Sequence, residues 1–230
     1  MKIEVEIAVS RLDNAERRIA LEIYETNGEG ILSQLDVYAV EQFISPSTAD
    51  QVIESKQIGS CTGQIFDRER ALNNSFDITT QNAGVQIKTF VQCAYNEDGK
   101  LLPELVERAA NPFDERRNIN SSAVSNRDLI GEHSFVLVER ISVNTPYRRQ
   151  GIGTAMLNML LTEALEMLPS IRFAVSWPCA SDADLADMGF PAGARLPATG
   201  LGQKRAEDFH HAVGFRGLGL TRFWAKRLVP

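Results

Sequence analysis

The chain has 230 residues, of which 43% are hydrophobic and 23% are charged, and its net charge is −6. This composition provides enough apolar side chains for a core, so it excludes an intrinsically disordered chain. The negative charge argues against a nucleic-acid-binding protein. The longest apolar segment, near residues 156–161, is far shorter than the roughly 20 residues of a membrane span.

Cysteine usage and the N-terminus indicate a cytoplasmic protein. The three cysteines are far apart and form no CxxC pair, so we expect buried, reduced thiols and no structural metal site. The first ten residues alternate charged and apolar side chains, and they lack the unbroken apolar core of a signal peptide.

Residues 1–130 are predicted to form a strand-rich N-terminal part of the domain. Alternating apolar and polar side chains predict strands at residues 3–9, 18–24 and 31–43. Ser45 is a suitable N-cap and Pro46 a suitable first helical residue, which predicts a short helix as far as Lys56.

The remainder of this part is expected to hold one more strand, a short helix and a loop. Strand-forming residues at 85–95 precede a turn-like Asn-Glu-Asp-Gly sequence, residues 103–110 suit a helix, and the polar residues 111–127 predict a long surface loop. The net charge is −8 over residues 1–130 and +2 over residues 131–230. Either this is ordinary surface variation, or a polyanionic ligand binds the second half.

Residues 131–177 carry the most informative pattern. The stretch Ser134–Val143 is rich in strand formers and apolar on both faces, which is typical of a central, covered strand. Residues 155–168 place leucine and methionine side chains along one helical stripe, and residues 171–177 form another apolar strand. The order strand, glycine loop, helix, strand defines an α/β unit.

The glycine loop, Arg148-x-x-Gly151-x-Gly153, lies where this helix begins. A helix N-terminus presents unpaired backbone N–H groups and a partial positive charge, and glycine lets that backbone approach a phosphate. A Walker loop requires Lys-Ser or Lys-Thr after its second glycine, but Gly153 is followed by Thr154 and Ala155. A dinucleotide-binding loop requires a third glycine or alanine where this chain has Met156, so neither motif is present. A tight turn with solubilising arginines and a pyrophosphate site both remain open.

Two motifs resemble a known family. The sequence Val143-x-x-x-Tyr-Arg-Arg-Gln-Gly-Ile-Gly-Thr154, followed by a leucine-rich helix, resembles the acetyl-CoA signature of the GNAT superfamily of N-acetyltransferases. Ala206-x-x-Phe-His-x-x-x-Gly-Phe215, followed by a strand-like segment at 221–228, resembles that superfamily's second motif. The resemblance covers about residues 134–228.

The resemblance implies an α/β (α+β) fold with a mixed, splayed central sheet flanked by helices. It implies acetyl-CoA as cosubstrate and no metal, with the acceptor amine attacking the acetyl thioester directly in the splay. Backbone groups of Ile141 and Val143 would pair with pantetheine. The pyrophosphate would be held by the loop residues Arg148, Arg149, Gln150, Gly151, Ile152, Gly153 and Thr154.

Two residues are candidates for proton transfer. On regular strand geometry Glu139 shares a face with Ile141, and it serves either as a general base for the amine or as a salt-bridge partner of Arg172; a strand bulge would change its face. His210 stands where the resemblance implies a tyrosine that protonates the leaving thiolate. It either takes that role or is a surface histidine beside His211.

The sequence thus predicts an N-acetyltransferase acting on a small-molecule or peptide amine, with residues 131–230 as its acetyl-CoA-binding half. Residues 178–203 form an expected insertion beside the acceptor site. A catalytically weak acyl-CoA-binding module is the alternative, because the tyrosine is missing. We expect no nucleic acid and no membrane as partner, and a homodimer is compatible with the sequence.

Overall fold

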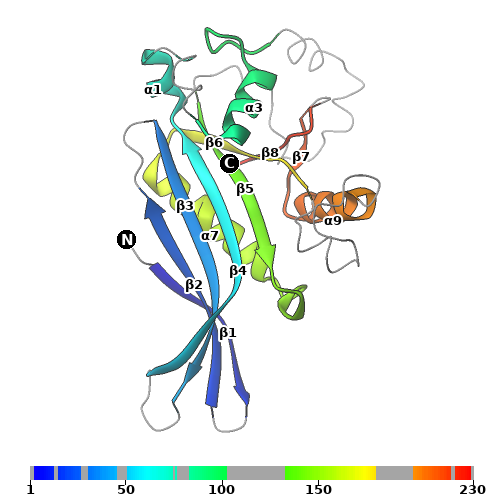
Figure 1. The fold of residues 1–230 in the computed structure, drawn as a ribbon. Coiled ribbons are helices and arrows are strands. Elements are labelled where there is room, and N and C mark those ends of the chain that lie inside the picture. Colours follow the sequence, from blue (N-terminus) through cyan, green and yellow to red (C-terminus); the bar gives the residue numbers. More distant parts are fainter. Residues whose placement is uncertain are drawn as a thin grey trace.

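A computed structural model describes residues 3–12, 15–26, 31–45, 51–74, 76, 83–102, 133–179, 199–218 and 221–228. One eight-stranded sheet runs through the molecule in the order β1-β2-β3-β4-β5-β6-β8-β7. Helices flank this sheet, and its two ends do not close on each other (Figure 1). The fold is therefore the mixed, open α+β arrangement expected from the sequence.

The N-terminal half supplies four antiparallel strands, β1 (Ile3–Leu12), β2 (Ala15–Thr26), β3 (Leu32–Ile44) and β4 (Val52–Phe66). The three strands expected in this region are confirmed; the first two are a few residues longer than predicted, and the third is shifted by one residue. The lower parts of these strands project beyond the layer that the long helix α7 covers (Figure 1).

The helix predicted from Ser45 to Lys56 is wrong. Residues 52–56 begin β4, which pairs with β3 from Val52 to Phe66; residues 46–50 lie outside the described part of the chain. The capping signal at Ser45 is real in isolation, but the backbone hydrogen bonds of a long β3–β4 ladder outweigh a single cap worth about 1 kcal/mol.

The strand predicted at 85–95 is also wrong, since this segment forms α3 (Val85–Ala94) after the short helix α1 (Arg68–Asn73). The buried residues of α3 are Ile87, Phe90, Val91 and Ala94, a spacing of three and four that lies on one helical face. Strand propensity misled the prediction, whereas periodicity already favoured a helix. The expected helix at 103–110 and loop at 111–127 lie outside the described residues.

The central unit matches the prediction closely. Strand β5 (Ser134–Val143) leads through a 3-10 turn, η1 (Thr145–Tyr147), into α7 (Ile152–Met167) and then β6 (Ile171–Ser176). Strand β5 pairs antiparallel with β4 and parallel with β6. Both faces of β5 are covered: Val136 and Val138 pack in the cluster with α7, while Phe135 and Leu137 pack in the cluster with α3.

The C-terminal elements are α9 (Thr199–Ala212), β7 (Arg216–Gly217) and β8 (Trp224–Arg227). Strand β8 pairs with β6, which confirms the strand expected after the second motif. Gly214 adopts a left-handed φ of 96° and ends the helix, so that Phe215 enters the core fully buried. Among the described helices, none is both long and apolar enough to cross a membrane.

Candidate active site

The site begins where β5 and β6 part. Their pairing ends at Val138 and Ser176, after which β5 continues to Val143 while the chain leaves β6 through Trp177 and Pro178. We call this point the fork. Beyond it, one edge of β5 has no strand partner in the described structure, so its backbone groups can pair with an extended ligand.

A β-bulge lies at the fork. Val138 pairs with Gly63 and Arg140 with Thr62, so Glu139 is the extra residue. Before the bulge Val136 and Val138 face α7, and after it Ile141 and Val143 do. The regular alternation assumed for Glu139 is therefore interrupted, and the bulge sets the direction of its side chain.

Glu139 is partly buried in this position. Burial, and secondarily the negative charge of Asp36 on β3, raise the pKa of its carboxyl above the ordinary value. A salt bridge with Arg172 is not formed; Arg172 instead donates to the carbonyl of Pro169 at 3.4 Å. Of the two roles open from the sequence, the structural ion pair with Arg172 is therefore not made.

The glycine loop has an unusual backbone. Arg149 and Gly151 adopt left-handed φ values of 62° and 82°, and Gly151 is the N-cap of α7. The first helical hydrogen bond is donated by the N–H of Ala155 to Gly151, and the backbone N–H groups of residues 149–154 donate to no acceptor in the described chain. Left-handed residues alternate here with right-handed ones, and the backbone N–H groups point to no acceptor among the described residues. This arrangement forms a concave cluster of donors of the kind that binds anions.

Arg148 fixes the glycine loop to β5, and Gly153 packs closely against neighbouring side chains. Arg148 donates from Nε to the carbonyl of Val143 at 2.8 Å, so the loop is tied to the end of β5, and this carbonyl is already engaged. A Cβ on Gly153 would lie 3.5 Å from Phe209 and 3.6 Å from Val143. An alanine fits there, but a larger side chain would displace Phe209 of α9.

One cleft of about 1350 Å³ joins these elements. It holds the fork, the glycine loop and the facing side of α9, and its charged lining consists of four arginines against two carboxylates. Every site residue predicted from the sequence lines it except Gln150. Those that do are Glu139, Ile141, Val143, Arg148, Arg149, Gly151, Ile152, Gly153, Thr154 and His210.

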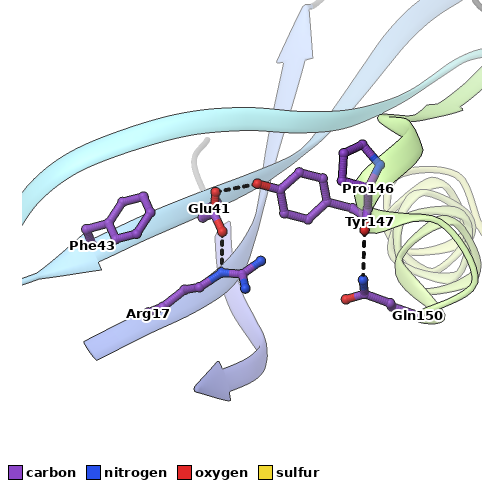
Figure 2. Close-up of a pocket in the computed structure, with 6 residues that line it drawn as sticks. All are labelled: Arg17, Glu41, Phe43, Pro146, Tyr147 and Gln150. Carbon is purple, nitrogen blue, oxygen red and sulfur yellow. Dashed lines mark hydrogen bonds and ion pairs between the residues drawn. The ribbon is translucent and has the colours of Figure 1, made fainter. Parts of the chain in front are cut away.

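Gln150 points elsewhere, into a smaller pocket of about 430 Å³ on the other side of the loop (Figure 2). There it donates to the carbonyl of Pro146 at 3.2 Å. Beside it, the buried carboxylate of Glu41 on β3 pairs with Arg17 of β2 and accepts a 2.5 Å hydrogen bond from Tyr147. This cluster joins the N-terminal strands to the turn from which the glycine loop starts.

His210 is buried, not on the surface. Its Nδ1 lies 2.7 Å from the carbonyl of Ala206 and its Nε2 lies 2.9 Å from Oγ of Ser176. Burial lowers the pKa of its imidazole, and the hydrogen bond to Ala206 partly opposes that shift. The surface reading of this histidine is wrong, and a neutral ring is favoured.

The cleft suits coenzyme A. The unpaired backbone N–H groups of the loop can donate hydrogen bonds to a pyrophosphate, and the excess of arginine in the lining favours a polyanion. The edge of β5 that has no strand partner can pair with the amide groups of an extended pantetheine arm. Within the described residues, no group of three His, Cys, Asp or Glu side chains is placed to hold a metal ion.

Sequence reasoning missed two contributors to the site. Ser176, at the end of β6, and Arg205, on α9, both line the cleft. Arg205 lies one residue before the second motif, so its place on α9 followed from the motif, but its side-chain direction did not. Nothing in the local sequence distinguished Ser176 from an ordinary buried strand serine.

Comparison with known families agrees with this geometry. The model of the acetyltransferase (GNAT) family matches residues 114–190, a span that includes β5, the glycine loop, α7 and β6. Residues 114–190 are therefore similar to the GNAT family, whose proteins in general transfer acetyl groups from acetyl-CoA. No curated protein sequence matches the chain.

The Glu41 cluster predicts a stability effect. Tyr147→Phe removes a hydrogen bond to a carboxylate that is only 4% exposed, so we expect a loss of about 1–3 kcal/mol in the free energy of unfolding, measured by urea denaturation. Tyr24→Phe is the matched control, because the exposed Tyr24 donates to Glu22 at 2.8 Å. Equal effects of both substitutions would show that the cluster does not anchor the turn.

Proposed function

We propose that this protein transfers the acetyl group of acetyl-CoA to a primary amine, carried by a small molecule or a peptide. The observation that carries the proposal is the set of unpaired amides at residues 149–154, which opens into the same cleft as the fork and Glu139. Bound acetyl-CoA would supply an activated acyl carbon with a thiolate leaving group.

The loop residues bind and orient. The amides of residues 149–154 and the guanidinium of Arg149 would hold the pyrophosphate through charge-assisted hydrogen bonds, each worth about 1.5–3 kcal/mol. The helix dipole of α7 adds only about 0.3–1 kcal/mol, so the directed amides dominate the binding. The free edge of β5 near Ile141 would align the pantetheine arm toward the fork.

Glu139 would act on the acceptor amine. It lies at the bulge beside the fork, partly buried, and its raised pKa makes it a stronger base than an exposed glutamate. Removing a proton from the ammonium form of the amine gives the neutral nitrogen that attacks. Positioning and proton transfer are therefore the work of this chain, and no covalent enzyme intermediate is required.

A coenzyme-binding module without transfer activity is the second candidate. It is favoured by His210, because both ring nitrogens of this residue are engaged with Ala206 and Ser176, so the position expected for a tyrosine offers no direct proton donor to the cleft. Binding without turnover is the property that separates this candidate from an enzyme.

Amine-dependent thiol release tests the proposal. Purified protein is incubated with acetyl-CoA and a panel of small amines and short peptides, and free thiol and acetylated amine are measured together. We expect at least one amine to give stoichiometric thiol and acetylated product. Tight binding of acetyl-CoA with no product from any amine would support the binding module instead.

The glycine loop predicts a specific loss of coenzyme affinity. In Gly151→Ala the left-handed φ of 82° costs about 1–2 kcal/mol, which would displace the amides and raise the Kd for coenzyme A by about 5–30-fold, measured by calorimetry. Gly200→Ala is the control, because Gly200 is an exposed glycine of α9 with no atom near its added Cβ. An unchanged Kd in Gly151→Ala would contradict the pyrophosphate site.

The charge of Asp36 predicts a shift in pH dependence. Glu139 acts only when ionised, so kcat/KM falls as pH drops through its raised pKa. Asp36→Asn removes a negative charge that raises this pKa, and the acidic limb of the profile should move to lower pH. Glu22→Gln removes a carboxylate of β2 that is not a cause of the raised Glu139 pKa, and it should leave the limb in place. An unmoved limb in Asp36→Asn would remove Glu139 as the base.

A further inference from the structure

The ring of His210 has no nitrogen directed at the cleft. Its Nδ1 faces the carbonyl of Ala206 at 2.7 Å, and since a carbonyl only accepts, Nδ1 carries a hydrogen. Its Nε2 faces Oγ of Ser176 at 2.9 Å, and the edges of Phe209 and Phe215 flank the ring. Although His210 lines the cleft, its ring nitrogens can therefore exchange a proton with the cleft only through Ser176.

Ser176 lies at the fork. It is the last residue of β6 that pairs with β5, and its hydroxyl lies 3.1 Å from the carbonyl of Val138, its pairing partner. Although only 3% exposed, it lines the same cleft as Glu139 and His210. The hydroxyl thus stands between the buried ring and the point where the two strands separate.

The hydroxyl has two alternative acceptors. It carries one hydrogen, which it can donate either to Nε2 of a neutral His210 or to the carbonyl of Val138. When Nε2 is protonated, it donates to Oγ and the hydroxyl hydrogen is free to turn outward or to Val138. The Ser176–His210 pair is therefore hydrogen-bonded whether Nε2 of His210 is protonated or unprotonated, and a proton relay requires this.

We propose that Ser176 exchanges a proton with the attacking amine nitrogen and with the departing thiolate, and that His210 serves it as a proton store, while Glu139 only neutralises the ammonium form beforehand. The inference rests on the proposed acetyl transfer. As the amine nitrogen bonds to the acyl carbon, its proton passes to Oγ while the hydroxyl hydrogen moves to Nε2. As the carbon–sulfur bond breaks and sulfur keeps the electron pair, the same transfer runs in reverse and protonates the thiolate.

Ser176→Ala tests the relay, using the amine found in the thiol-release assay. We expect kcat to fall about 100-fold while KM for acetyl-CoA changes less than twofold, because a proton-transfer group is lost and the coenzyme loop is untouched. Ser176→Thr, which keeps the hydroxyl, should restore most of kcat. An unchanged kcat in Ser176→Ala overturns the relay.

Ser134→Ala is the matched control. Ser134 is fully buried at the opposite end of the same β5–β6 pairing, where its Oγ contacts Ser170 at 3.1 Å outside the cleft. It should lose a comparable free energy of unfolding and keep kcat. An equal loss of kcat in both variants would show that Ser176 has only a structural role.

Nitrogen NMR of His210 provides a readout that does not depend on activity. We expect protonated Nδ1 and unprotonated Nε2 at neutral pH in the free protein, with signals assigned by substituting His133 and His211. The opposite tautomer, or a stable acetyl adduct on Ser176 by mass spectrometry, would overturn the relay. If the wild type acetylates no amine, the relay falls with the proposed function, and this spectrum still shows whether the buried pair exists.

Discussion

The separation of β5 from β6 after Val138 and Ser176 determines the rest of the site. Two parallel strands in a covered sheet normally keep pairing, because an unpaired buried backbone group is costly. Here Pro178, which has no N–H to donate, follows the last paired residues of β6, while β5 passes through the bulge at Glu139 and stays paired with β4 as far as Val143. The result is an open edge that faces a cleft, with the ends of α7 and α9 on its sides.

The two ionisable residues proposed for proton transfer, Glu139 and His210, are respectively partly buried and buried. Glu139 and His210 are both withdrawn from water, and burial shifts their pKa values in opposite directions, up for the carboxyl and down for the imidazole. Both groups are thereby moved toward neutrality, since burial penalises a charge of either sign. Hydrogen bonds to Ser176 and Ala206, rather than charge, orient the histidine.

Much of the fold and most of the residues that line the large cleft were predictable from the sequence. Strand β5, α7 and the glycine loop carry strong local signals, namely a run of strand formers, a leucine stripe and two glycines at a helix start. The errors came where local propensity competes with tertiary pairing: residues 52–56 join a long hairpin, and α3 is helical despite its β-branched residues. The contact of Ser176 with His210 joins residues 34 apart and depends on where β6 ends, which no local pattern encodes.

A hydrogen bond of 2.8 Å from the side chain of Gln203, on α9, to the carbonyl of Pro178, just after β6, joins the two ends of the connection between β6 and α9. Because the start of α9 is fixed to the end of β6 directly, the position of the helix does not rely on the length of chain between them. Residues in that connection can therefore change in number and kind during evolution without moving the end of the helix that carries His210.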